Sequence, residues 1–187
     1  LLRYDEQETL PKSPYPVSVL TLPDLDPVLQ RFKAADYPIQ EYSGEITGGI
    51  RFAIALDPAG NGIEIMETPG APRVIGARLI VDNLEESEEF FMRVFNVEPG
   101  RRIRTETFDE VFIEFGDGPF LALYESLDEE PLAKSWYPVV AIYSSDYDAV
   151  LERLKTGGLG VRERGDRVLF ANDPSGNVVE VVRQTNP

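Results

Sequence analysis

Residues 51–68 read RFAIALDPAGNGIEIMET, and residues 167–184 read RVLFANDPSGNVVEVVRQ. The two stretches share Arg, Ala, Asp-Pro, Gly-Asn and Glu at equivalent places, and upstream of them residues 15–37 match residues 137–159. Two matching blocks in the same order indicate an internal structural repeat. The chain is therefore predicted to contain copies of one folded unit.

Each copy has the same predicted order of elements. An apolar strand (17–22 or 139–143) leads to an Asp suited to a helix N-cap, which is Asp24 or Asp26 in the earlier copy and Asp146 in the later one. A helix with one apolar face follows, and then three short strands. The last two strands are joined by Asp-Pro-x-Gly-Asn, whose Pro and Gly suit a tight reversal. The predicted unit is βαβββ.

A more divergent third copy lies between these two. Its first strand is predicted at 77–81, its helix at 84–95, and its closing strands at 111–115 and 119–124, joined by Gly-Asp-Gly. Helices and mostly antiparallel strands thus recur along the whole chain. The predicted fold class is α+β.

Three units imply one complete pair and one unit without a partner. Residues 71–187 are predicted to form a complete domain with units at 74–130 and 135–184, and residues 1–70 to be the remnant of another domain, with one unit at 14–70. Residues 1–4 resemble the last strand of the middle unit, so we interpret them as the end of an earlier unit. The first unit is then expected to close against an upstream segment or another copy, which makes a homodimer one expected assembly.

Composition excludes several classes of partner. The formal charge of −15, from 33 acidic and 18 basic residues, predicts that neither nucleic acid nor anionic membrane surfaces are partners. No apolar run approaches the roughly 18 residues that a membrane-spanning helix needs, and a cytoplasmic location is the default expectation. The chain has no Cys and no His, so it lacks thiolates and the commonest metal ligand.

The order of strand, Asp-containing helix start, helix and D-P-x-G-N-x-(I/V)-E resembles the vicinal oxygen chelate superfamily, which includes glyoxalase, bleomycin-resistance and extradiol-dioxygenase relatives. The resemblance covers nearly the whole chain. It implies that two units pair into a half-barrel with the helices outside and a cavity inside. It also implies a metal held by a His or Gln near the start of each first strand and a Glu on a closing strand. Function is implied less strongly, because one fold hosts many chemistries.

The chain departs from the family at the positions that match these ligands. The first-strand position falls on residues whose side chains cannot bind a metal, namely Val17, Gly76 and Val139. The closing-strand Glu is kept as Glu64 and Glu180, whereas the middle unit has Ala122 or Leu123. Because one carboxylate per pocket does not supply the three or four ligands of a zinc or iron site, we expect no metal and no other cofactor.

Pairing of the last two units would bring five inward-facing residues to one cavity: Arg78, Phe120, Tyr124, Tyr143 and Glu180. Glu180 is a candidate general acid or base, or else a partner of Arg78 across the barrel. Arg78 could instead hold a ligand carboxylate or enolate. The aromatic residues offer flat surfaces to a small ligand or form core. Trp136 is expected to line the cavity mouth or to hold the two units together.

Three functions stay open on the sequence alone. The first is a metal-independent protein that binds a small molecule in the cavity. The second is a glyoxalase- or dioxygenase-type lyase, isomerase or oxygenase, either metal-free with Glu180 as base or with a metal in the absent unit. The third is a structural or regulatory module. Whether the protein is an enzyme is left undecided by these patterns.

Overall fold

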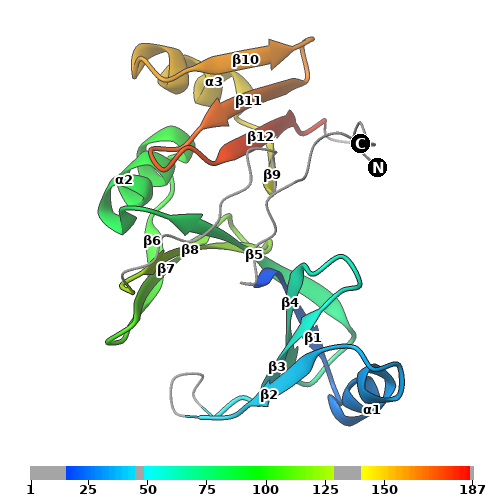
Figure 1. Cartoon of the computed structure of the whole chain (residues 1–187). Helices are drawn as coiled ribbons and strands as arrows, with labels where there is room; N and C mark the ends of the chain where they lie inside the picture. Colours follow the sequence, from blue (N-terminus) through cyan, green and yellow to red (C-terminus); the bar gives the residue numbers. More distant parts are fainter. Residues whose placement is uncertain (1–15, 45–48, 129–139, 186–187) are drawn as a thin grey trace.

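The computed structural model describes residues 16–44, 49–128 and 140–185, and three βαβββ units follow one another along them (Figure 1). The first unit contains β1 (Pro16–Leu22), α1 (Asp26–Ala34), β2 (Ile39–Tyr42), β3 (Phe52–Leu56) and β4 (Gly62–Glu67). The second contains β5 (Arg73–Val81), α2 (Leu84–Phe95), β6 (Pro99–Arg104), β7 (Phe108–Glu114) and β8 (Phe120–Ser126). The third contains β9 (Val140–Ser144), α3 (Tyr147–Thr156), β10 (Val161–Arg164), β11 (Val168–Asn172) and β12 (Val178–Arg183). Within these ranges no helix is long and apolar enough to cross a membrane.

The strands form two sheets. Strands of the first two units make one eight-stranded sheet in the order β2-β3-β4-β1-β5-β8-β7-β6, and those of the third unit make a four-stranded sheet in the order β10-β11-β12-β9. In each unit the first strand runs parallel to the last, and the other neighbours are antiparallel. The predicted α+β class and the predicted βαβββ repeat are confirmed.

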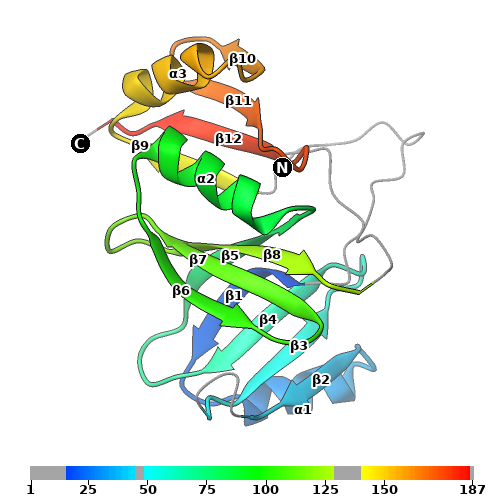
Figure 2. The ribbon, with the colours of Figure 1, turned by 90° about the vertical axis from the view of Figure 1, so that its left-hand side faces the viewer.

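The first two units join where β1 pairs with β5 in antiparallel orientation, with Ser18 opposite Ala77 and Val19 opposite Gly76. The eight strands curve into one half-barrel (Figure 2). The expectation that the middle and last units would pair around a common cavity is therefore wrong, and the sheet crosses the boundary expected between residues 70 and 71. The first unit's sheet is continuous with that of the middle unit through β1 and β5. Residues 1–4, interpreted as the end of an earlier unit, lie outside the described residues. A short connection, residues 68–72, holds β4 and β5 in neighbouring positions.

Alternation along the strands directs one face of this sheet toward the helices. On β3, Ala53 and Ala55 are completely buried in a small core with Leu29 of α1. On β7, Val111 and Ile113 are buried in the large core that contains α2. Residues between these positions point to the other, concave side of the sheet.

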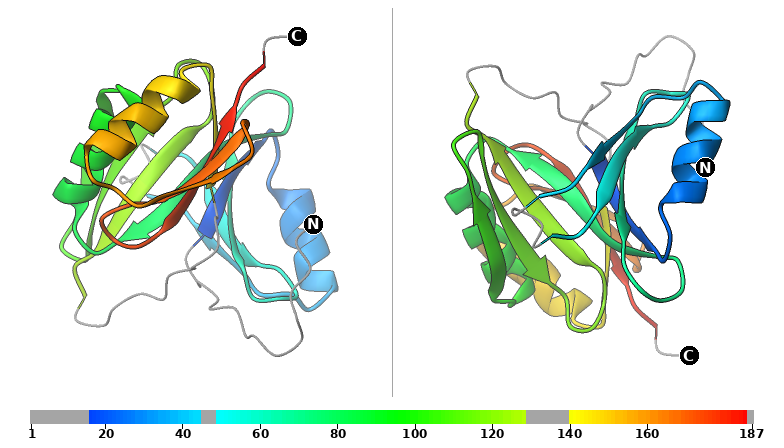
Figure 3. Two further views of the ribbon diagram at one scale, coloured as in Figure 1. Left: turned by 90° about the horizontal axis from the view of Figure 1, so that it is seen from above. Right: turned by 90° about the horizontal axis from the view of Figure 1, so that it is seen from below.

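The third unit packs against the second through helices rather than through strand pairing. Helices α2 and α3 lie side by side (Figure 3), and residues such as Phe91, Val94 and Leu154 belong to one hydrophobic core that spans both units. A polar contact supplements this core, because the buried Asn177 side chain donates from Nδ2 to the Ile80 carbonyl of β5 at 2.8 Å. The second Asp-Pro-x-Gly-Asn turn thus fastens the third unit to the second.

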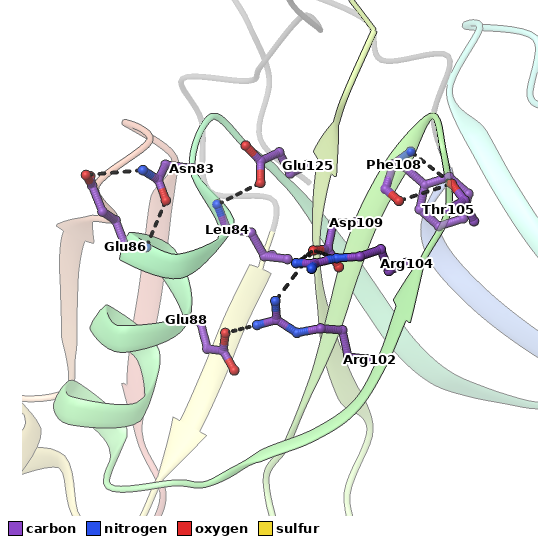
Figure 4. Close-up of polar contacts among 10 residues, drawn as sticks. All are labelled: Asn83, Leu84, Glu86, Glu88, Arg102, Arg104, Thr105, Phe108, Asp109 and Glu125. Atoms are coloured by element: carbon purple, nitrogen blue, oxygen red, sulfur yellow. Dashed lines mark hydrogen bonds and ion pairs between the residues drawn. The ribbon is translucent and has the colours of Figure 1, made fainter.

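Carboxylates from closing strands bind the N-terminal ends of two helices. The Leu25 amide donates to Glu67 at 2.8 Å, and the Leu84 amide donates to Glu125 at 3.2 Å (Figure 4). A negative charge at this end stabilises the amides that lack an acceptor within the helix, and it interacts favourably with the helix dipole. The expected Asp caps are met in part: Leu25 is the N-cap residue of α1, and the Asp24 side chain before it accepts from the Asp26 amide at 3.0 Å. Asp146 is the N-cap residue of α3, but its side chain makes no capping bond and accepts from Arg153 instead.

Candidate ligand-binding site

A cavity of about 410 Å³ lies on the concave side of the eight-stranded sheet. Its walls come from both the first and the second unit, and most of the lining is apolar: Val19, Ile50, Phe52, Ile54, Met66, Ile75, Ile103, Phe108, Phe112, Phe120 and Tyr124. Charged lining residues are Glu64, Arg78, Arg101, Glu110 and Glu114. A concave apolar wall with a few polar groups is the usual build of a small-molecule site.

Arg78 lies between two carboxylates in this cavity. Its Nε donates to Glu110 Oε1 at 2.6 Å, and its Nη1 donates to Glu64 Oε2 at 3.1 Å. The three side chains come from β5, β7 and β4, and their exposed fractions are 11%, 4% and 12%. A guanidinium presents several fixed donors, so one Arg can hold two acceptors from different strands.

Burial and charge act in opposite directions on this cluster. Burial raises the pKa of Glu110, and the attraction of Arg78 reduces this rise without cancelling it. Burial also disfavours the charged form of Arg78, yet the pull of Glu110 and Glu64 outweighs it, and the pKa of Arg78 is raised. Arg78 therefore stays a cation, while Glu110 is the group of the pair that is easier to neutralise by protonation.

Aromatic rings surround the charged cluster. Phe108 and Tyr124 stack with centroids 5.0 Å apart, and the Arg78 guanidinium carbon lies 5.8 Å from the Tyr124 centroid. Phe112 and Phe120 meet edge to face at 5.1 Å. This arrangement gives a ligand ring several faces and edges to contact.

Gly76 makes room for one of these rings. A Cβ atom at this position would lie 2.2 Å from the Phe120 ring, which is too close for any side chain unless the ring moved. Phe120 and Gly76 are in register on the parallel strands β8 and β5. The lack of a side chain at Gly76 thus leaves the space that the Phe120 ring occupies.

The structure brings three of the sequence-predicted residues together and separates the others. Arg78, Phe120 and Tyr124 line the cavity, whereas Glu180 of β12 and Tyr143 of β9 belong to the other sheet. Tyr143 is 68% exposed. The expected convergence of all five residues on one cavity is wrong, because it assumed pairing of the last two units. The proposed Arg78–Glu180 pair is likewise wrong, since Glu64 and Glu110 bind Arg78. Trp136 lies outside the described residues.

Sequence reasoning missed the residues that β7 contributes. Residues 101–110 look like a solvated hairpin of mixed charge, but Phe108, Glu110 and Phe112 alternate onto the cavity face. Asp109 points to the opposite face and is held by Arg102 and Arg104, the latter at 2.8 Å from Nε (Figure 4). The period-two pattern of β7 was the signal that could have identified Glu110.

The described residues contain no group of three or more Asp, Glu, His or Cys side chains placed to hold a metal ion. In the cavity, the carboxylates of Glu64 and Glu110 both bind the Arg78 guanidinium. Their arrangement is that of an internal ion-pair cluster in a mostly apolar site.

Comparison with known protein families supports the fold. A family model described as the Glyoxalase/Bleomycin resistance protein/Dioxygenase superfamily matches residues 73–181, more than half of the chain. This chain belongs to that superfamily. The match covers the second and third units of this superfamily member, and the first unit repeats the same topology. No curated protein sequence matches the chain.

Solved structures of glyoxalase I are similar to this superfamily member in fold. Glyoxalase I from Zea mays superposes with a TM-score of 0.70 at 18% identity, over 92% of this chain and 68% of the maize chain. Its V278E mutant gives 0.71 at 21% identity, over 94% and 68%. The trypanothione-dependent glyoxalase I of Leishmania major gives 0.52 at 17% identity, over 59% of this chain and 86% of the other. Identities this low show the fold alone.

Proposed function

We propose that the protein binds a small, largely apolar molecule in the cavity between its first two units, without a metal ion. The observation that carries this proposal is the composition of the cavity wall, which is aromatic and aliphatic apart from a compact charged cluster. A volume of about 410 Å³ suits a molecule of two or three rings. Binding would be driven mainly by removal of apolar surface from water.

The residues present do not fit the metal site that the superfamily resemblance implies. Val17 and Gly76 offer no donor side chain, and any replacement of Gly76 would collide with Phe120. Glu64 is the retained carboxylate, and its Oε2 already accepts from Arg78. The guanidinium supplies fixed positive charge to the carboxylates, so metal chemistry forms no step of the proposed function.

A second candidate function is acid–base chemistry by Glu110. Its carboxyl is buried in an apolar cavity, and burial raises its pKa, which is the condition that favours a general acid or base near neutral pH. Arg78 beside it could stabilise a developing oxyanion. Glu180, the base considered from the sequence, lies outside this cavity.

The binding proposal is tested with N-phenyl-1-naphthylamine, a fluorescent apolar probe, in the presence of EDTA. Saturable enhancement is expected with the native chain. Ile54→Trp should fill part of the cavity and weaken binding by at least about tenfold, which is ~1.4 kcal/mol. Phe170→Trp is the matched control, since Phe170 is the equivalent repeat position on β11 and lines no part of this cavity. Equal binding by Ile54→Trp and the native chain, both folded by circular dichroism, would overturn the proposal.

A further inference from the structure

The charged cluster in the cavity carries one negative charge in excess when all three groups are ionised. Glu64 and Glu110 each place a carboxylate within hydrogen-bond distance of Arg78, and among the described residues this one guanidinium bonds both of them. All three side chains are largely buried, so solvent screens their charges poorly. An uncompensated charge in such a place is costly.

The remaining charged residues of the lining do not remove this excess. Arg101 and Glu114 both line the cavity, and both are exposed. Arg101 lowers the pKa of Glu110 only as a minor influence after burial and Arg78. The two exposed residues have opposite charges and lie where water screens them. The buried part of the cavity therefore keeps its negative character.

The aromatic wall suits a positively charged guest as well. Phe108 and Tyr124 stack next to the cluster, and aromatic faces attract organic cations through their quadrupoles. Tyr124 already shows this preference toward Arg78, whose guanidinium carbon is 5.8 Å from the ring centroid. The formal charge of −15 on the whole chain also favours the approach of cations.

We propose that the natural ligand is an organic cation: an apolar, ring-containing body with a protonated amine or amidine that bonds to the carboxylates of Glu110 and Glu64. This inference rests on the proposed function, since it assigns the ligand class of the same cavity. The cationic group of the ligand balances the negative charge that Arg78 does not neutralise. The ring system occupies the aromatic part of the cavity.

Three probes of one shape and different charge test the inference: 1-naphthylmethylamine, 1-naphthylmethanol and 1-naphthoate, titrated at neutral pH and followed by naphthalene fluorescence. The amine is expected to bind about tenfold or more tighter than the alcohol, because a charge-assisted hydrogen bond is roughly twice as strong as a neutral one. The naphthoate should bind weakest. Glu110→Gln should reduce the preference for amine over alcohol to about twofold or less, since it removes the excess charge.

Two further variants keep the test decisive if Glu110→Gln fails to fold. Glu64→Gln should reduce the preference in the same way, and Glu180→Gln, the equivalent repeat position outside the cavity, should leave it unchanged. Equal binding of amine and alcohol, or tighter binding of the naphthoate, would overturn the cation inference while N-phenyl-1-naphthylamine binding still supports the cavity. Loss of binding by all four probes would overturn the proposed function itself.

Discussion

Arg78 is the residue on which the interior of the half-barrel depends most. It is buried, it bonds two strands other than its own, and its removal would leave Glu64 and Glu110 without their common partner. Breaking a buried ion pair from one side costs more than the pair contributes, because the remaining charge stays desolvated.

Arg78→Met is therefore expected to lower the free energy of unfolding by about 3 kcal/mol. Lys155→Met is the control, because Lys155 and Glu163 form a pair whose side chains are 56% and 43% exposed, and its loss should cost less than about 1 kcal/mol. Urea denaturation of both variants measures the difference. Similar losses in the two variants would contradict the role assigned to Arg78.

The raised pKa of Glu110 predicts how stability depends on pH. The folded state holds this proton more tightly than the unfolded state, whose carboxyl has the ordinary pKa of 4.5. The contribution is fully present below pH 4.5 and is lost as pH rises through the folded-state pKa. Glu110→Gln cannot lose it, so the native chain should become less stable relative to this variant over that window. Parallel stability curves from pH 4 to 8 would show that Glu110 titrates normally.

Sequence patterns identified three residues of the cavity lining and missed Glu110. Arg78, Tyr124 and Phe120 could be placed on an inward face because period two fixes orientation once a strand is known. Glu110 was missed because three neighbouring arginines made its strand look solvated, although Arg102 and Arg104 face Asp109 on the other side. Local charge composition was a poorer guide than alternation.

At the scale of elements, the two Asp-Pro-x-Gly-Asn turns have the same local structure but different contacts with the rest of the molecule. Both form the same local turn, in which the Asp accepts from the amide of the Asn, as in Asp57 with Asn61 at 2.8 Å and Asp173 with Asn177 at 2.7 Å. Asn61 is exposed, whereas Asn177 is buried and also bonds the Ile80 carbonyl. The sequence predicts the turn, and the neighbouring unit decides its importance.

Asn177→Ala is expected to destabilise the protein by about 2 kcal/mol, because it removes the side-chain hydrogen bonds to the buried Ile80 carbonyl and to Asp173 Oδ2. Asn61→Ala is the matched substitution in the exposed copy of the turn, and it should cost less than about 1 kcal/mol. Thermal unfolding of the two variants measures the contrast. A larger loss for Asn61→Ala would contradict the assigned contact between units.

Which units share a sheet could not be obtained from the repeat itself, because three copies of one pattern have equivalent first strands. The lengths of the connections between units were a better guide to which units share a sheet. Five residues, 68–72, separate β4 from β5, whereas residues 127–139 separate β8 from β9. Short connections favour neighbours in one sheet, and this favours the pairing of the first two units.

On the scale of the whole molecule, the two cores differ in size and in the units they connect. The larger core runs through the second and third units and includes α2 and α3, while the first unit has a smaller core around Leu25, Leu29 and Ile65. Local stability follows the amount of buried apolar surface. The first unit is thus the weaker end of the half-barrel.

Native-state hydrogen exchange should reflect this division. Amides of α2 and α3 are expected to exchange with a common opening free energy, and amides of α1 to open at a free energy lower by roughly 1–2 kcal/mol. Separate opening of α3 before α1 would contradict the shared core of the second and third units. The experiment also shows whether the cavity, whose walls come partly from the first unit, opens independently of the rest.

Methyl NMR with N-phenyl-1-naphthylamine tests the central claim, a ligand cavity between the first two units, most directly. In a sample labelled at isoleucine methyls and treated with EDTA, the claim predicts intermolecular contacts from the probe to Ile54, Ile75 and Ile103, which line the cavity. It predicts none to Ile142, which is buried in the core shared by the second and third units. Contacts to the third unit alone, or no contacts from a probe that binds, would contradict the account.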